Sequence, residues 1–394
     1  MNARERFHGI CDFSLKDDPF IWSVWAWAET IDRWYAEGLP VDNIDTMKPV
    51  NMHFLGYDHQ IESIPPRGSI RGMGRYGMDP WIVEIDPFFE REILEEDERY
   101  QVLRDYDGAI VRRKREGDYS IPEYLEYPVK NQADWDLYKK RLEPHSPGRW
   151  PDGWDRIQDK WLAWPVKEGQ EGRSWEERDF PLGMSNLSLY GNLRNYMGLE
   201  NLSRALFKNK NLVLEMMDRQ LWLAVEMLER VYRQGVTLDY VFIWEDMCFN
   251  KGPLVSPKWI REFMVPRYRK FTDILHKNGC KCVAVDCDGD IDLMLPIWID
   301  SGINATFPLE RTSGVDARSI RKKYGRDMIL IGNIDKRALA AGKAEIDREV
   351  ELVKDMIRPG GYFVNVDHFV PPDVPYANMK YFIDEVLKLG TQPG

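Results

Sequence analysis

The stretch CKCVAVDCDGDIDLM, residues 280–294, changes from a buried strand to a charged loop within a few positions. The apolar residues 283–285 are followed by three carboxylates, a thiol and a glycine: Asp286, Cys287, Asp288, Gly289 and Asp290. Carboxylates this close repel one another unless solvent, a metal ion or a substrate offsets their charge. The stretch therefore predicts a strand that ends in a loop with a chemical task.

The same strand-then-helix pattern repeats through the C-terminal half of the chain. Strands are expected in LDYVFIWED, CKCVAVD, INATFPLE, MILIGNI and GYFVNVD, with helices between them. Buried β-branched strands that alternate with helices indicate parallel βαβ units. Five such units fit either a closed (β/α)8 barrel or an open doubly wound sheet, and both place function at the carboxyl ends of the strands.

Two observations favour the barrel. No G-x-G-x-x-G or Walker loop follows a strand, so a nucleotide-binding open sheet loses support. Polar residues follow all five expected strands, as the mouth of a barrel requires. We therefore predict an α/β fold with a single (β/α)8 TIM barrel over residues 1–394.

The N-terminal half gives weaker signals. PFIWSVWAW is expected to be the first barrel strand, and AETIDRWYAEGLP its helix. The alternation around Asp107 and Gly108 is typical of a β-hairpin, so residues from about 85 to 130 are interpreted as a hairpin insertion. Residues 143–179, rich in Pro, Gly, Trp and charge, are expected to form a long crossover or lid.

Composition excludes several classes of protein. The formal net charge of -11 argues against nucleic-acid binding, which needs a basic face. No apolar run is long enough to span a membrane, and the first residues lack the apolar region of a signal peptide. Five cysteines, an odd number, suit a reducing compartment better than a disulfide framework. We expect a cytoplasmic protein with no membrane partner.

Two strand ends carry acids suited to catalysis. Glu245 and Asp246 end the strand VFIWED, where one carboxylate can raise the pKa of the other and create a general acid or base. The alternative is that one of them caps a helix or forms a local ion pair. Asp286 and Asp288 can face one cavity from their loop, whereas Asp290 is expected to cap the next helix and Gly289 to take an unusual backbone angle.

His368 follows the last expected strand and is one of six histidines. A neighbouring carboxylate, Asp367, can fix its tautomer, and a neutral imidazole is a good zinc ligand. The alternative is a structural histidine. We assign catalytic roles to Glu245, Asp246, Asp288 and His368, and expect Asn333, at another strand end, to bind substrate.

The tryptophans of IWSVWAW allow two interpretations. Spacing of two places Trp25 and Trp27 on one face of a strand, and a barrel strand turns that face inward. Trp22, Trp25 and Trp27 can then line a flat apolar pocket for an aromatic substrate, or they can fill the core. Cys280 and Cys282 lie at the start of a strand and are expected to be structural.

These residues resemble the uroporphyrinogen decarboxylase superfamily. The resemblance rests on WEDMCFNKGPLVSP, VDCDGDI, FPLE, LIGNIDKRAL and NVDHFVPPDVPYAN, and extends to PFIWSVWAWAETIDRWYAEGLP and GNLRNYMGLENLSRALFKNKNLVLEMM. It implies a (β/α)8 barrel. The superfamily contains the porphyrinogen decarboxylases and zinc-dependent methyltransferases that exchange methyl groups with a corrinoid protein.

The chain departs from the decarboxylase pattern at two places. WSVWAWAET stands where the decarboxylases carry an arginine-bearing RQAGR element, and Asp367-His368-Phe369 replaces their G-H-G. A polyanionic tetrapyrrole would find few cations to pair with. The resemblance therefore implies the methyltransferase branch.

By position, the zinc-binding H-x-C-G and Cys of the methyltransferases correspond to Asp286, Asp288 and His368 in this chain. The resemblance thus implies a zinc site with oxygen and nitrogen ligands, which zinc accepts. Such a site suits the polarisation of an ether or phenolic oxygen better than the activation of a thiol. No corrinoid-binding signature is present, so cobalamin would arrive on a partner corrinoid protein.

The resulting hypothesis is an O-demethylase. A methoxylated, aromatic substrate stacks on the tryptophans, a metal ion or a protonated Glu245 or Asp246 stabilises the leaving oxygen, and a corrinoid protein accepts the methyl group. Two alternatives are a metal-free decarboxylase or lyase that uses Asp288 and His368, and a ligand-binding barrel without activity. The sequence is compatible with a homodimer but does not decide the oligomeric state.

Overall fold

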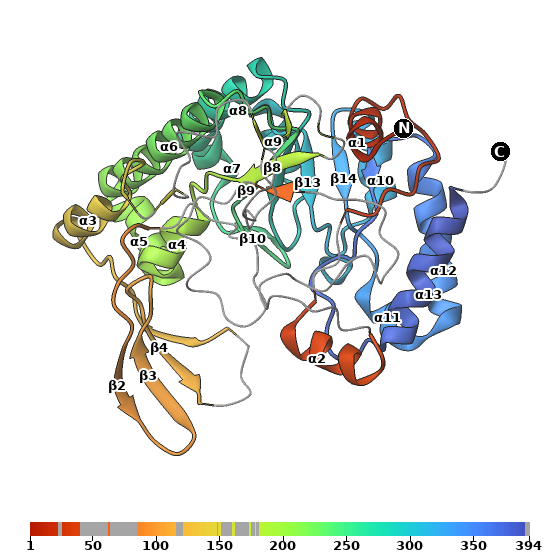
Figure 1. Ribbon diagram of the computed structural model, residues 1–394. Helices are drawn as coiled ribbons and strands as arrows, with labels where there is room; N and C mark the ends of the chain where they lie inside the picture. Colours follow the sequence, from red (N-terminus) through yellow and green to blue (C-terminus); the bar gives the residue numbers. More distant parts are fainter. Residues whose placement is uncertain are drawn as a thin grey trace.

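The computed structural model describes residues 1–22, 26–39, 62–63, 85–115, 121–147, 149–150, 160–161, 173–174, 178 and 181–390. A parallel sheet of seven strands lies at its centre, with helices on its outer side (Figure 1). The strand order is β1-β8-β9-β12-β13-β14-β15. Their bounds are Glu62–Ser63, Leu182–Ser185, Tyr240–Trp244, Cys282–Asp286, Ala305–Phe307, Ile329–Ile331 and Tyr362–Phe363. The five strands expected in the C-terminal half are thus confirmed, each in parallel pairing.

The segment predicted as the first strand lies beside the last one. Ile21 forms a parallel bridge with Val364, and Ala26 forms one with Val370. The Trp22 amide donates to the Val364 carbonyl at 3.0 Å, and the Val364 amide donates to the Phe20 carbonyl at 2.9 Å. In a barrel the first and last strands are neighbours, so this order fits the predicted fold. In the part of the chain that the structure describes, no pairing joins this segment to β1.

Alternating side chains of the strands enter two separate apolar layers. One layer, here called the inner cluster, contains alternate strand residues together with Phe7, Ile10 and Trp22. The strand residues are Tyr240, Phe242, Cys282, Ala284, Ala305, Phe307, Ile329, Ile331 and Phe363. The residues between them, such as Val241 and Val283, pack in the larger layer under the helices. Because both faces of these strands are buried, their sequences are continuous apolar runs.

Helices connect the strands and cover the outer layer. In Figure 1, α6 and α8 lie on one side of the sheet, and α12 and α13 on the other. The helices after β8 are α4 (Gly191–Met197), α5 (Leu199–Lys208), α6 (Lys210–Tyr232), α7 (Pro257–Trp259), α8 (Val265–Lys277), α9 (Leu295–Asp300), α10 (Ala317–Tyr324), α11 (Lys336–Ala341), α12 (Lys343–Ile357) and α13 (Tyr376–Leu389). Ser256 caps α7 through the Trp259 amide, with Pro257 in the first turn.

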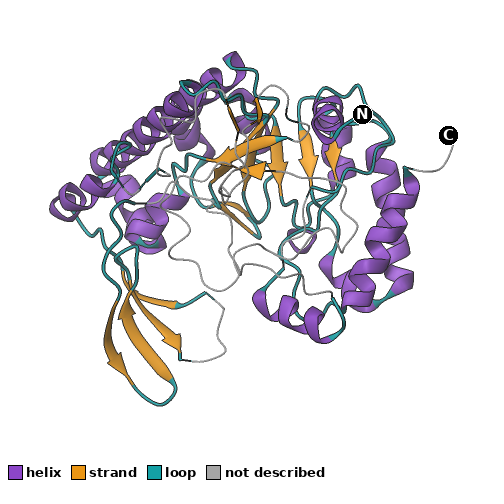
Figure 2. Cartoon of the chain, viewed as in Figure 1, coloured by secondary structure: helices purple, strands orange, loops and turns teal. Residues whose placement is uncertain are grey.

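The N-terminal part adds α1 (Ala3–Cys11), α2 (Ala28–Ala36), α3 (Gln132–Tyr138) and a second sheet. That sheet is antiparallel, in the order β2-β3-β4-β5, and projects from the body of the molecule (Figure 2). Its strands are Glu92–Glu96, Tyr100–Arg104, Ile110–Lys114 and Glu123–Glu126, all within the segment interpreted as an insertion. The strands β3 and β4 pair across the turn at Asp107 and Gly108.

The predicted crossover at 143–179 lies largely outside the described residues. Within it, β6 (Lys160–Trp161) pairs with β7 (Arg173–Ser174). Two further short strands, β10 (Cys248–Phe249) and β11 (Gly252–Pro253), form a hairpin after β9. No helix within the described ranges combines the length and apolarity needed to cross a membrane.

Candidate functional site

The ends of β9 and β12 place two side chains on the inner face of the sheet. Trp244 and Asp286 are paired in register, two residues beyond Phe242 and Ala284 of the inner cluster. Because strand side chains alternate, Trp244 and Asp286 continue the inner face at its carboxyl end. The strand register therefore brings the carboxyl ends of β9 and β12 side by side, as expected of strand ends that form a site.

Asp286 is surrounded by other carboxyl groups. Burial raises the pKa of its carboxyl well above the usual value, and the negative charges of Asp288, Asp246 and Glu310 raise it further. No described residue donates a hydrogen bond to this carboxyl. The protonated form is therefore favoured, which is the state required of a general acid.

Asp288 and His368 form a pair beside this acid. The distance from His368 Nε2 to Asp288 Oδ2 is 3.3 Å. Burial lowers the pKa of His368, but the hydrogen bond and charge of Asp288 outweigh it, so the net shift is upward. Asp288 Oδ1 is buried and accepts no hydrogen bond from a described residue. His368, at the end of the β15 unit, thus reaches the loop that follows β12.

Two cations at the site were not singled out from the sequence. Lys336 Nζ lies 3.5 Å from Asp367 Oδ1 and 4.0 Å from Glu310 Oε1. Arg194 donates to Asp246 Oδ2 at 2.7 Å and to the Asp246 carbonyl at 2.8 Å. Lys336 could have been identified from the sequence, because it begins a helix directly after a strand end. No local pattern around Arg194 predicted its contact with Asp246, the second residue after β9.

Glu245 and Asp246 point to different surroundings. Glu245 is fully buried and accepts hydrogen bonds from the amides of Leu189, Tyr190 and Gly191, at 2.9, 2.7 and 3.4 Å, and from the Tyr268 hydroxyl at 2.8 Å. Burial raises the pKa of Glu245 to about 7, although these hydrogen bonds act to lower it.

The contacts of Glu245 and Asp246 match the structural alternatives to catalysis, in which one acid caps a helix and the other forms a local ion pair. Glu245 satisfies the free amides where α4 begins. Asp246 forms the local ion pair with Arg194, has φ of 45° and accepts from the Asp288 amide at 3.4 Å. Asp246 therefore places its negative charge near Asp286, whereas Glu245 holds the loop of residues 189–191 in place.

Asn333 does not occupy the position expected of a substrate ligand. Its amide group donates to the carbonyls of Leu309 and Val315, at 2.8 and 2.9 Å, and its oxygen accepts from the Ala317 amide at 3.0 Å. The side chain is fully buried, and these three bonds use its main donors and its acceptor. It joins the loop after β13 to the start of α10, which differs from the predicted contact with substrate.

The three tryptophans also differ from one another. Trp22 is buried in the inner cluster, with its ring 5.1 Å from that of Tyr240 and 4.9 Å from that of Phe363. It therefore fills the core, the alternative to a pocket. Trp27 is partly exposed and lies 5.0 Å from the ring of Phe369, next to His368. Trp25 lies outside the described residues, and its role stays a prediction.

The rest of the charged loop is structural. Gly289 has φ of 87°, and a Cβ there would lie 2.9 Å from the backbone of Phe249. Asp290 accepts from the Asp292 amide at 3.1 Å, a bond within the loop, whereas α9 begins at Leu295 without a side-chain cap, so the expectation that Asp290 caps the next helix is wrong. Cys287 is buried, and burial raises its pKa well above the usual value. Cys280 and Cys282 are likewise buried free thiols.

The predicted zinc ligands lie in one region but not in a metal-binding arrangement. Among the described residues, no three His, Cys, Asp or Glu side chains are placed to hold a metal ion. Asp288 and His368 instead contact each other directly. The described residues thus bring the buried carboxyl of Asp286 and the Asp288–His368 pair together, and zinc stays a prediction.

Comparison with known proteins gives the family. The sequence profile described as Uroporphyrinogen decarboxylase (URO-D) matches residues 188–389. A "Uroporphyrinogen decarboxylase" of Trichlorobacter lovleyi is 25% identical over 192 residues, 48% of this chain and 52% of that protein. One of Sodalis glossinidius is 35% identical over 75 residues, 19% of this chain and 21% of that protein. The match thus spans about half or less of the length of these relatives.

A solved structure gives the fold. A "methyltransferase from Methanosarcina mazei" superposes with a TM-score of 0.59 and 15% identity, over 98% of this chain and 99% of the other. At this identity the likeness concerns the fold, and it extends over nearly the whole of both chains. With the profile matching about half of its residues, the chain belongs to the uroporphyrinogen decarboxylase family.

Proposed function

We propose that the protein transfers a methyl group from a methoxylated aromatic substrate to a corrinoid protein, and that Asp286 protonates the leaving oxygen. The observation that carries this proposal is a carboxyl at the end of β12, on the inner face of the sheet and crowded by three other carboxylates. A phenolate is a poor leaving group at neutral pH unless it receives a proton. A carboxyl that keeps its proton answers this need.

The residues have distinct tasks in this proposal. The bond between the methyl carbon and the ether oxygen breaks, its electron pair stays on the oxygen, and that oxygen takes the proton of Asp286. His368 is partly exposed and contacts Asp288, so it can pass a proton from solvent towards Asp286 after each turnover. Asp246 and Glu310 keep Asp286 protonated by their charge.

The aromatic part of the substrate would lie near Trp27. Its ring is partly exposed and packs at a tilt against Phe369, whose neighbour is His368. An aromatic ring packs favourably on such a surface. A methoxyarene bound there would present its ether oxygen towards the acids of β12.

No step of this proposal passes through a metal ion, because the described residues do not supply a ligand set. The corrinoid, brought by its own protein, supplies a nucleophilic cobalt that accepts the methyl group. The zinc prediction is tested separately by metal analysis of protein purified without chelator. Stoichiometric zinc that is lost in Asp288→Ala would support it, and metal-free protein with full turnover would exclude it.

Decarboxylation is the second candidate. It is favoured by the family, whose matched members are decarboxylases by name, and by the Asp288–His368 pair. Against a polyanionic substrate, the cations described at the site already face carboxylates: Arg194 faces Asp246, and Lys336 faces Asp367. A smaller carboxylate substrate remains compatible with this arrangement.

One experiment separates the two candidates. The protein is incubated with a panel of methoxyarenes and a reduced corrinoid protein, and methylation of cobalt is followed by absorbance while released carbon dioxide is measured. We expect cobalt methylation that depends on the chain and on the methoxyarene. Carbon dioxide release without any corrinoid, from a carboxylated substrate, would instead establish the decarboxylase.

We also infer that the sheet closes into an eight-stranded barrel. Support comes from the inner cluster, to which alternate residues of the strands contribute, and from the bridges that Ile21 and Ala26 form with Val364 and Val370.

A further inference from the structure

Trp244 is the aromatic residue next to Asp286 at the carboxyl end of the sheet. The two residues are register partners on β9 and β12, and both side chains continue the inner face. Trp22, in the inner cluster, is buried against several other rings, whereas Trp244 is partly exposed. Among the described residues, no aromatic ring packs against Trp244. Part of its indole is therefore open beside the proposed acid.

The helix α4 fixes the position of this indole. Its first residue is Gly191, and a Cβ there would lie 2.5 Å from Cε3 and 2.6 Å from Cζ3 of Trp244. Glycine is therefore the residue that lets the ring lie this close to the helix backbone. The guanidinium of Arg194, one turn further on, lies 5.3 Å from the centre of the indole, which is within the range of a cation–π contact. Two residues of α4 thus contact the ring.

The two acids that follow Trp244 hold α4 in this place. Glu245 accepts hydrogen bonds from the amides of residues 189–191, where the helix begins. Asp246 accepts a hydrogen bond from Arg194 at 2.7 Å. Three consecutive residues at the end of β9 are thus attached to the start of one helix, which leaves the indole little freedom to turn. An aromatic surface that is already fixed loses little entropy when a planar ligand packs on it.

We infer that Trp244 selects an aromatic substrate and positions it beside Asp286. Gly191 and Arg194 fix the plane of the indole on which the substrate packs. The inference rests on the proposed function, because it takes the leaving oxygen to lie at Asp286. Adjacent strands are about 4.8 Å apart, so the atoms attached to that oxygen lie within reach of Trp244. Trp27 belongs to the segment beside β15, so the two tryptophans contact different parts of the substrate.

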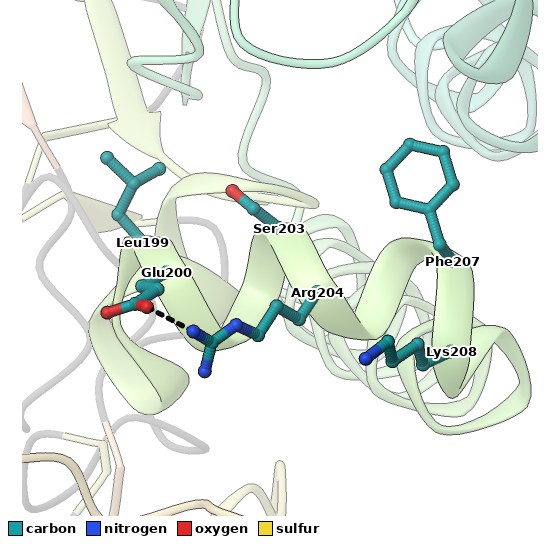
Figure 3. A pocket seen from close by; sticks show the side chains of 6 residues that line it. All are labelled: Leu199, Glu200, Ser203, Arg204, Phe207 and Lys208. Atoms are coloured by element: carbon teal, nitrogen blue, oxygen red, sulfur yellow. Dashed lines mark hydrogen bonds and ion pairs between the residues drawn. The ribbon is translucent and has the colours of Figure 1, made fainter.

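An arene could instead bind in the surface hollow on α5. This hollow, of about 590 Å3, is lined by Leu199, Phe207 and four polar residues of the same helix (Figure 3). The carboxylate in this lining, Glu200, is exposed and ion-paired with Arg204. The hollow on α5 therefore offers no buried acid for a leaving oxygen, and Phe207→Ala is a control for binding away from the sheet.

The test compares the binding of anisole and methoxycyclohexane, two methyl ethers that differ in the aromatic ring, by NMR titration without a corrinoid protein. The natural protein should bind anisole more tightly by about threefold to tenfold, the ratio that a contact between rings supplies. Trp244→Leu, which keeps apolar bulk, should abolish this preference, whereas Trp244→Phe should retain most of it.

Trp222→Leu, on α6, is the matched control. Its indole is also exposed in part, to 37%, and lies under the guanidinium of Arg219 at 4.2 Å, but it is remote from the strand ends. Trp222→Leu and Phe207→Ala should both leave the preference for anisole unchanged.

Gly191→Ala tests whether α4 fixes the indole. Its Cβ must displace the ring of Trp244, so the preference for anisole should fall although the tryptophan is present. The double variant with Trp244→Leu should show no further loss, because both changes act through the same contact. The comparison of Trp244→Leu with Trp244→Phe does not depend on the folding of Gly191→Ala.

The inference and the proposed function fail in different ways. Anisole binding that depends on Trp244, without methyl transfer to a corrinoid protein, would overturn the methyl transfer while supporting the role of Trp244. Methyl transfer from anisole with unchanged kcat and KM in Trp244→Leu would overturn the inference and keep the methyl transfer. A preference for anisole that survives in Trp244→Leu also overturns the inference, as does a natural protein that binds the two ethers equally or not at all.

Discussion

Asp239 joins the N-terminal helix to the start of β9 through a buried ionic network, and its effect on stability can be predicted. Its Oδ1 accepts from His8 Nε2 at 2.6 Å and from Arg4 Nε at 3.0 Å. Its Oδ2 accepts from Arg178 at 2.6 Å and from the Leu182 amide at 2.8 Å. Burial alone would raise the pKa of Asp239, but the His8 hydrogen bond and the Arg178 charge lower it to about 2.

The magnitude follows from linkage. The pKa falls from 3.8 to about 2 in the folded protein, and at about 1.4 kcal/mol per unit this corresponds to about 2.5 kcal/mol of stability. Because the folded pKa is depressed, this contribution is present above the unfolded pKa and is lost as the pH falls towards about 2. In Asp239→Asn the carboxylate that faces the buried guanidinium of Arg178 is absent. The variant should therefore be less stable by about 3–5 kcal/mol near neutral pH.

The assay is urea unfolding of the natural protein and of Asp239→Asn from neutral pH to about pH 2. The difference between their free energies of unfolding should shrink by about 2 kcal/mol between about pH 5 and pH 2, where the folded carboxyl is half protonated. The control is Asp12→Asn, whose exposed ion pair with Lys281 is expected to contribute less than about 1 kcal/mol. A difference that does not change with pH would refute this account of Asp239.

Two further predictions concern the site. Asp288 raises the pKa of His368, so Asp288→Asn should lower it, as read from the imidazole signals in an NMR titration; an unchanged titration would contradict the pairing. Gly289→Ala should lower the free energy of unfolding by about 3 kcal/mol, because its Cβ would meet the Phe249 backbone in addition to the strain of positive φ. Gly279→Ala, also at positive φ but with open space, should cost about 1 kcal/mol, and equal losses would show that the contact with Phe249 is unimportant.

The C-terminal half of the fold was predictable because each strand is marked locally. Runs such as VFI and VAV are buried on both faces, so their sequences are continuously apolar and are soon followed by acids. The first strand was harder to identify because Ile21 and Ala26 pair through isolated bridges, and its partner lies more than 300 residues away in the chain. Period-two patterns predict a strand, but not its neighbour.

The site was predictable as a region but not residue by residue. Asp286, Asp288 and His368 were expected together because the family resemblance implied one ligand set, and strand ends of parallel units meet at one edge. A polar residue at such an end can turn either to the mouth or back to cap a helix. Glu245 and Asn333 turn back, because the loops after β8 and β13 present amides and carbonyls to them. That direction depends on loops distant in sequence, which no local pattern specifies.

The central claim is that Asp286 donates a proton to the leaving oxygen. Its most direct test compares the natural protein with Asp286→Asn on methoxyarenes whose parent phenols differ in acidity, by the rate of methyl transfer to the corrinoid protein. We predict that Asp286→Asn lowers the rate on the order of 10²–10⁴-fold for the least acidic phenols, and that this loss shrinks as the phenol becomes a better leaving group. Asp290→Asn in the same loop should retain full activity. An equal loss for every substrate, or an unimpaired Asp286→Asn, would contradict the claim.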